Sequence, residues 1–131
     1  MVEIGIKGKQ TKIVDDTNTA EVYGSGDIAV FATPAMIGLM EYTASQSVAP
    51  YLAEGQSTVG TVVNVKHLAA TPKGMEVWCE STVTEVDRRR LVFEVKAYDQ
   101  LGTLIGEGTH ERFIIDKEKF LGKTYSLLER I

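Results

Sequence analysis

The chain has 131 residues, of which 44% are hydrophobic and 24% charged, and its formal net charge is −4 at neutral pH. This length fits one domain that buries its core without metal or disulfide support, so we expect a single domain over residues 1–131. The ordinary composition argues against disorder, and the negative charge excludes the basic surface that nucleic-acid binding requires.

The sequence has no segment that would carry it into or across a membrane. Residues 1–7 lack the apolar core of a signal peptide, and no run approaches the ~18 apolar residues of a membrane helix. Cys79 is the single cysteine, so no internal disulfide can form, which fits the reducing cytoplasm. We therefore expect a cytoplasmic protein that does not contact membranes. Cys79 itself lies in an alternating stretch and is interpreted as a small buried side chain.

The first third of the chain predicts a strand followed by loops. Residues 10–15 are typical of a first strand, and residues 16–18 carry turn-forming side chains. The glycines within residues 23–27 suit a surface loop. A short helical turn is expected over residues 27–31.

The strongest helix signal follows over residues 34–48. Thr33 is a good N-cap, and Pro34 fits the first helical position, where a missing N–H costs nothing. Pro50 predicts the end of the helix. Apolar or small side chains cover most of the circumference: Met36, Ile37, Leu39, Met40, Thr43, Ala44 and Val48. A helix of this kind should be buried, either by a sheet or by a second subunit.

The remaining sequence predicts mostly strands. The β-branched, alternating segments are residues 58–67, 75–86, 91–99 and 104–115. The links between these strands lie at residues 71–74, 87–90 and 99–102, and each is short enough for a hairpin. The basic run Arg88–Arg90 is interpreted as a solvated turn. A short helix near residues 117–121 is expected at the end. The order of strand, long helix and antiparallel meander predicts an α+β fold in which a sheet wraps around one helix.

Three polar residues sit where this architecture would bury them or place them at element ends. Glu41 lies mid-helix among apolar neighbours, where a carboxylate is costly to desolvate without a partner. Considered singly, each residue also has an ordinary explanation. Glu41 could reach solvent beside the apolar stripe, Thr33 could serve only as an N-cap, and His67 could be a structural histidine at a strand end.

Four sequence segments taken together favour a shared catalytic role for these residues over the separate explanations. The segment Phe31–Glu41, the pair Gly60-Thr61, the segment His67–Gly74 and the segment Gly106–Arg112 resemble the fluoroacetyl-CoA thioesterase-like branch of the hot-dog thioesterases. The resemblance covers roughly residues 28–120 in the same order and with similar spacing. It implies a hot-dog fold, in which an antiparallel sheet wraps one long central helix. It also implies hydrolysis of an acyl-CoA thioester by a homodimer or a higher oligomer.

The resemblance also implies site residues. The family's Thr/Glu/His site maps onto Thr33, Glu41 and His67. Its glycine near the substrate carbonyl maps onto Gly60, and its arginine near the acyl group maps onto Arg112. The family's name-giving member has bulky aromatic residues before the catalytic threonine, whereas residues 23–28 here contain one aromatic residue. We therefore expect an acyl group other than fluoroacetyl.

The chemistry of thioester hydrolysis fits these residue types. A hydroxyl or carboxylate can attack the carbonyl, and a histidine can move the proton. The choice between Thr33 and Glu41 as nucleophile stays open. Eight helical residues span about 12 Å of rise, so both groups can reach one carbonyl in only two ways. Either Thr33 lies outside the helix, or Glu41 acts with the helix start of a neighbouring subunit.

Two other activities fit the same sequence. A hot-dog hydroxyacyl dehydratase would use a histidine and an acidic residue without the threonine. A non-catalytic acyl-CoA-binding protein would bind the ester without releasing a thiol. The sequence implies no metal or organic cofactor, because two histidines and one cysteine lack zinc-ligand spacing, and CoA would enter as part of the substrate.

Overall fold

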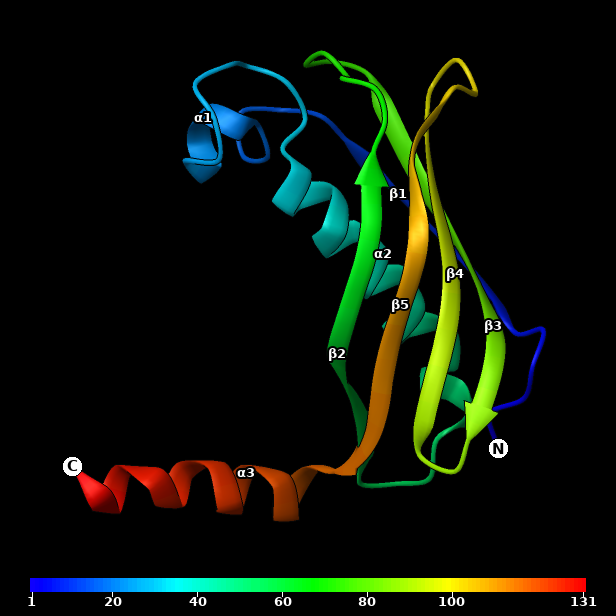
Figure 1. Cartoon of the computed structure of the whole chain (residues 1–131), viewed down its shortest axis with the longest axis vertical. Coiled ribbons are helices and arrows are strands. Elements are labelled where there is room, and N and C mark those ends of the chain that lie inside the picture. The colour runs from blue at the N-terminus through cyan, green and yellow to red at the C-terminus, as the bar shows by residue number, and fades with distance from the viewer.

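The computed structural model describes all 131 residues and consists of a five-stranded antiparallel sheet, one long helix and a projecting C-terminal helix (Figure 1). The strands lie in the order β1-β3-β4-β5-β2, so β1 and β2 form the two edges. The hairpin predicted at residues 71–74 is therefore wrong, because β2 pairs with β5 and not with β3, the strand that follows it in the chain. The elements in chain order are β1 (Lys7–Ile13), α1 (Ala20–Tyr23), α2 (Thr33–Val48), η1 (Ala49–Tyr51), β2 (Gln56–His67), β3 (Glu76–Asp87), β4 (Arg90–Asp99), β5 (Leu104–Asp116), α3 (Lys117–Tyr125) and η2 (Ser126–Arg130).

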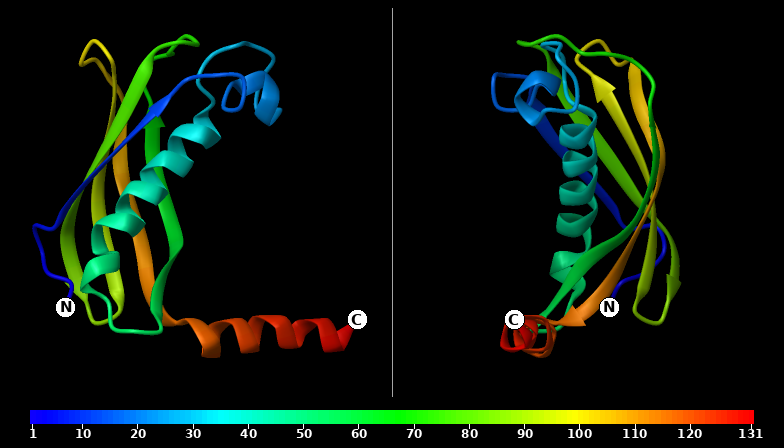
Figure 2. Two further views of the ribbon diagram at one scale, coloured as in Figure 1. Left: turned by 180° about the vertical axis from the view of Figure 1, so that it is seen from behind. Right: turned by 60° about the vertical axis from the view of Figure 1, so that its left-hand side comes forward.

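The sheet curls around α2, and the core lies between them (Figure 2). From α2 the buried residues are Met36, Leu39, Met40, Thr43, Ala44 and Val48. From the sheet they include alternate residues of β3 and β4, as expected for strands with one face on a core. Cys79 belongs to this core, and burial raises the pKa of its thiol to about 11. The predicted α+β architecture is confirmed, as is the buried position of Cys79.

One flank of α2 is left open within the single chain. Gly38 and Tyr42 are exposed and Ile37 is half-buried, although the apolar pattern predicted burial nearly all round. Every α2 side chain that the sequence marked as apolar is therefore buried except Ile37, and the open flank is the one that carries Gly38 and Tyr42. None of the helices is long and apolar enough to cross a membrane.

Some predicted boundaries were wrong. The first strand spans Lys7–Ile13 rather than residues 10–15, because it pairs with β3 along that whole length. The helical turn lies at Ala20–Tyr23 and not at residues 27–31, where Phe31 instead donates its N–H to the carbonyl of Thr71. The C-terminal helix runs to Tyr125, four residues beyond its predicted end. The Arg88 turn is confirmed, with a left-handed φ of 57°.

Candidate active site

Thr33 and His67 meet at the end of the sheet where α2 begins. The Oγ1 atom of Thr33 lies 2.7 Å from Nδ1 of His67. Thr33 was predicted as the N-cap, but Ala32 takes that position with an extended backbone, and Thr33 is the first helical residue. The Thr33 hydroxyl is therefore bonded to His67 rather than to a backbone N–H of its own helix.

The environment of His67 defines its protonation state. Burial lowers the pKa of His67 from its ordinary value, and a weaker backbone interaction with Ala69 opposes that shift. The ring is therefore neutral near pH 7. When the Thr33 hydroxyl donates to Nδ1, the ring proton resides on Nε2. This Nε2 atom is buried and forms no hydrogen bond within the chain. The pair is thus a hydroxyl with an adjacent base whose far nitrogen lacks an acceptor.

Glu41 lies in a second polar group farther along α2. Its Oε2 atom is 3.9 Å from Nη1 of Arg112, and the Arg112 side chain is 8% exposed. Thr58 on β2 holds the guanidinium by two hydrogen bonds, from Nε to its hydroxyl at 2.8 Å and from Nη2 to its carbonyl at 2.9 Å. Burial lowers the pKa of Arg112, and the Glu41 carboxylate opposes this change. Arg112 is therefore a fixed cation beside a carboxylate that remains 41% exposed.

Sequence reasoning missed His110, which completes this second group. Its Nδ1 donates to the carbonyl of Val62 at 2.7 Å, which leaves Nε2 to accept from Nη1 of Arg112 at 3.2 Å. Burial lowers the pKa of His110, and the nearby Arg112 adds to that shift, so the ring is neutral and can accept. The available signal was its position two residues before Arg112, because alternate strand residues share one face of a sheet.

Gly60 lies where these side chains converge. A Cβ at this position would lie 2.7 Å from Oε2 of Glu41, 3.2 Å from Nη1 of Arg112 and 3.2 Å from Cε1 of His110. All three atoms belong to side chains, and the shortest contact is with the end of the flexible Glu41 side chain. The absence of a side chain at Gly60 therefore allows Glu41 to approach Arg112.

Replacing Gly60 with alanine should displace the Glu41 carboxylate while the fold persists. If Glu41 takes part in the reaction, turnover should fall by about 10²-fold, the scale expected for a misplacement of about 1 Å. Steady-state kinetics with a circular-dichroism melt would check this. Gly38→Ala is the matched control, because a Cβ there meets nothing within 4 Å. Equal activities for the two variants would argue against a role for the Glu41 position.

Within one chain the two polar groups remain apart. Thr33 lies inside the same straight helix as Glu41, so the rise between them is about 12 Å. The alternative in which Thr33 lies outside the helix is therefore wrong. Thr33 and His67 are brought together, Glu41 joins Arg112 and Gly60, and these two sets do not touch.

Two clefts flank α2. One, of about 310 Å³, opens beside Thr33 and His67 and is lined mainly by apolar side chains such as Val30, Phe31 and Leu68. A larger cleft of about 580 Å³ lies between α2 and β1 and is lined by Gly38 and Tyr42 among others, but by none of the predicted site residues. The smaller cleft is therefore the one that adjoins the reactive pair.

Comparisons with known proteins concern the family and the fold. Residues 14–118 match the model of the family described as fluoroacetyl-CoA-specific thioesterase. A fluoroacetyl-CoA thioesterase from Streptantibioticus cattleyicolor is 46% identical over 94 residues, which cover 72% of this chain and 67% of that protein. A solved fluoroacetyl-CoA thioesterase structure superposes with a TM-score of 0.89 at 36% identity, covering 96% of this chain and 97% of the other. A thioesterase superfamily member from Thermus thermophilus gives a TM-score of 0.92 at 30% identity, covering 99% and 96%.

The fold is therefore that of the hot-dog thioesterases, as the sequence resemblance implied. More specifically, the chain belongs to the fluoroacetyl-CoA-specific thioesterase family and is a thioesterase.

Proposed function

We propose that this protein hydrolyses an acyl-CoA thioester with Thr33, His67 and Glu41, and that Arg112 and Gly60 help to hold the substrate. The observation that carries the proposal is the Thr33–His67 pair, with its 2.7 Å contact and its unpaired Nε2. A hydroxyl bonded to a neutral imidazole, which a third group then orients, is the arrangement of an activated nucleophile.

The pair suggests an order of proton transfers. As Thr33 Oγ1 attacks the thioester carbonyl, its proton passes to His67 Nδ1. The imidazolium returns that proton to the departing CoA sulfur, which leaves an acyl ester on Thr33. His67 then takes a proton from water as its oxygen attacks the ester. The bond from the acyl carbon to Thr33 Oγ1 breaks, the imidazolium returns its proton to Oγ1, and the acid is released. The positive end of α2 lies near the developing oxyanion.

In this proposal the third group comes from another subunit. The proton on Nε2 of His67 needs an acceptor, and a carboxylate there would stabilise the imidazolium. The Glu41 of the same chain is about 12 Å along the helix from Thr33. We therefore propose a homodimer in which Glu41 of one copy faces the Thr33–His67 pair of the other.

The two sheet edges indicate where such a dimer would form. The β1 edge carries Lys7, Lys9 and Lys12, and lysines on an edge strand oppose pairing with another sheet. The β2 edge has no charged residue from Gln56 to Val65, and it exposes Val62 by 42% and Val63 by 40%. Two copies related by a two-fold axis can join these β2 edges in antiparallel fashion.

The segment before Thr33 bears on the acyl group. Residues 21–28 are exposed, and Tyr23 is the aromatic residue among them. This segment therefore supplies no cluster of bulky aromatic side chains that would enclose a small fluorinated group. We propose an ordinary cellular acyl-CoA as the substrate. No cofactor takes part in the steps described, and the buried, unpaired Cys79 fits a cytoplasmic location.

A panel of acyl-CoA esters with detection of the free thiol tests the proposal. The wild-type protein should release CoA from at least one ester, and it should turn over other esters at least as well as fluoroacetyl-CoA. A dehydratase would instead consume a hydroxyacyl ester without releasing thiol. Binding of the esters with no thiol released from any of them would overturn the proposed activity.

A further inference from the structure

The C-terminal residues 117–130, comprising α3 and η2, form an arm that projects away from the rest of the chain (Figures 1 and 2). Every residue of the arm is exposed. Leu121, Tyr125 and Leu128 follow the spacing i, i+4 and i+7, so they form an apolar stripe along one face, and their exposed fractions are 51%, 64% and 60%. A helix of 9 residues that buries nothing is marginal in water by itself. The arm therefore needs a surface to pack on.

The direction of the arm limits what that surface can be. The arm extends past the β2 edge, at the end of the sheet opposite Thr33 and His67, and leaves an open space beside β2 (Figure 1). When two β2 edges pair in antiparallel fashion, the end of one sheet that carries the arm lies beside the end of the partner's sheet that carries Thr33 and His67. The arm then runs across the partner's end that carries Thr33 and His67. We call this end, formed by residues 14–33, 68–74 and 99–103, the site end.

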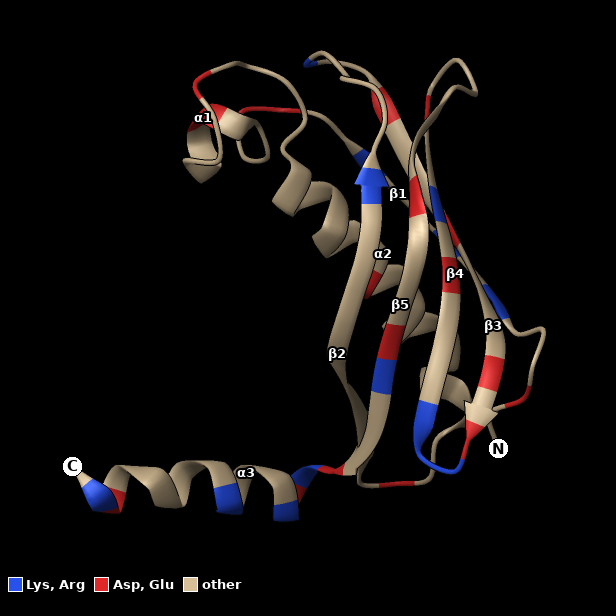
Figure 3. Cartoon of the chain, viewed as in Figure 1, with Lys and Arg blue, Asp and Glu red and all other residues tan.

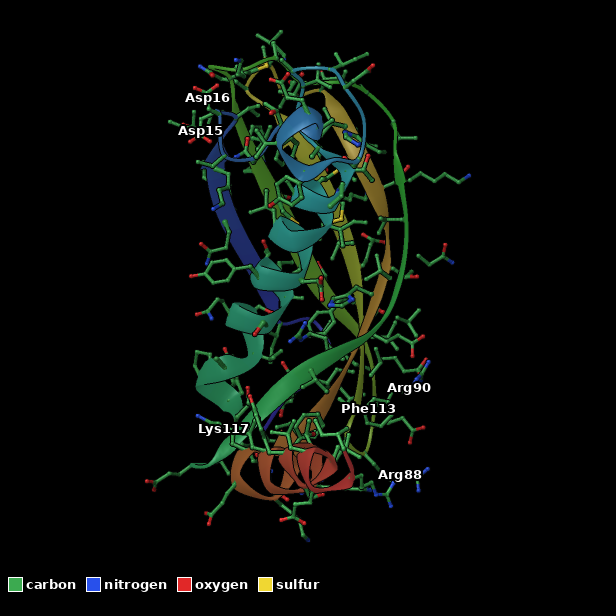
Figure 4. All side chains as sticks on the ribbon, turned by 90° about the vertical axis from the view of Figure 1, so that its left-hand side faces the viewer. Asp15, Asp16, Arg88, Arg90, Phe113 and Lys117 are labelled. Carbon is green, nitrogen blue, oxygen red and sulfur yellow. The ribbon has the colours of Figure 1, made fainter.

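Charge favours the same contact. The arm carries four basic residues and two acidic ones: Lys117, Lys119, Lys123 and Arg130, with Glu118 and Glu129. The site end carries five acidic residues and one basic one: Asp15, Asp16, Glu21, Asp27 and Asp99, with Lys73. Figure 3 shows these charges at opposite ends of the chain, and Figure 4 marks Asp15 and Asp16 at one end and Lys117 at the other.

Exposed apolar residues on the site end match the stripe of the arm. Leu68 is 50% exposed and lines the cleft that adjoins His67. Ile28 and Leu101, also on the site end, are 63% and 79% exposed. The structural match to the Thermus thermophilus protein covers 99% of this chain, so the arm belongs to the shared architecture.

We propose that the arm packs across the site end of a second copy of this chain and forms one wall of the entrance to that copy's cleft. This inference rests on the dimer in the proposed function. It assigns to residues 117–130 a role in the partner's site, where each arm would limit how a CoA ester enters.

Photo-crosslinking on the full-length protein tests this contact. Benzoylphenylalanine replaces Tyr125 on the arm, and in a control protein it replaces Ile13, which is 56% exposed on the lysine-rich β1 edge. The Tyr125 protein should form a covalent dimer whose linked peptide comes from the site end. The Ile13 protein should not form this dimer. A second substitution, Leu121→Asp with Leu128→Asp, should abolish the Tyr125 crosslink while the sheet-edge dimer persists.

Sedimentation and thiol release, measured on the same proteins, separate the possible failures. A dimer at micromolar concentration whose Tyr125 crosslinks are absent or map outside the site end would overturn the arm contact and leave the dimer in place. A monomer would overturn both the arm contact and the two-subunit site. Neither result alters the assignment of thioester hydrolysis, which thiol release tests separately.

Discussion

Replacing His67 with alanine is expected to lower kcat by 10²- to 10⁴-fold, the usual contribution of general acid–base catalysis. KM should change far less, because proton transfer stabilises the transition state and not the bound ester. The hydroxyl of Thr33 would lose its hydrogen-bond acceptor at 2.7 Å. The water that hydrolyses the acyl ester on Thr33 would lose the base that takes its proton. Steady-state kinetics on a protein with a normal melting profile would measure the effect.

The dependence of rate on pH adds a second test of His67. Because burial lowers the pKa of His67, the neutral ring persists below the usual titration point of pH 6.5. The wild-type kcat/KM should therefore be constant near neutrality and fall only as the pH drops below that value. His67→Gln should keep a hydrogen bond to Thr33 yet lose this acid limb together with activity. A near-wild-type kcat in His67→Ala would remove the histidine from the mechanism.

The sequence predicted the elements whose signals are local and periodic. The 3.6-residue pattern of Met36, Met40 and Ala44 located α2, and alternation located the strands, because both patterns reflect which face meets the core. The predicted ends of the elements were less accurate where pairing with a strand distant in the chain determines them. β1 begins at Lys7 because β3 is long enough to pair with it there.

The site was predictable only as far as the resemblance reached. Thr33, Glu41, Gly60, His67 and Arg112 could be named from motifs, but their grouping could not. Helical rise separates Thr33 from Glu41, and the hydrogen bonds to the Arg112 guanidinium depend on the register of β2 against β5, which the sequence does not encode locally. The same register brings Thr58 and Gly60 to Arg112, whereas His110 lies beside Arg112 because the two are alternate residues of β5. The direction of the C-terminal arm likewise depends on packing and not on periodicity.

Replacing Glu41 with glutamine is expected to reduce turnover by orders of magnitude while the fold and the binding of a CoA ester persist. Glutamine keeps the size of the side chain and its capacity for hydrogen bonds but removes the charge that would stabilise the His67 imidazolium. If Glu41 served only to neutralise the buried Arg112, the change would lower the stability of the fold and activity would hold. Unchanged turnover in the folded variant therefore contradicts a role for Glu41 in the reaction.

Mixing two inactive variants shows whether Glu41 acts on its own subunit or on the other. When His67→Ala and Glu41→Gln proteins are unfolded together and refolded as equal mixtures, about half of the dimers contain one chain of each kind. If Glu41 serves the partner's site, one of the two sites in each mixed dimer combines an intact His67 with an intact Glu41. Activity should then recover to about a quarter of the wild-type value, although either variant alone is nearly inactive. If Glu41 serves its own chain, both sites of the mixed dimer lack one group and no activity returns. Recovery would thus establish the two-subunit site, because no rearrangement within a single chain can supply both side chains.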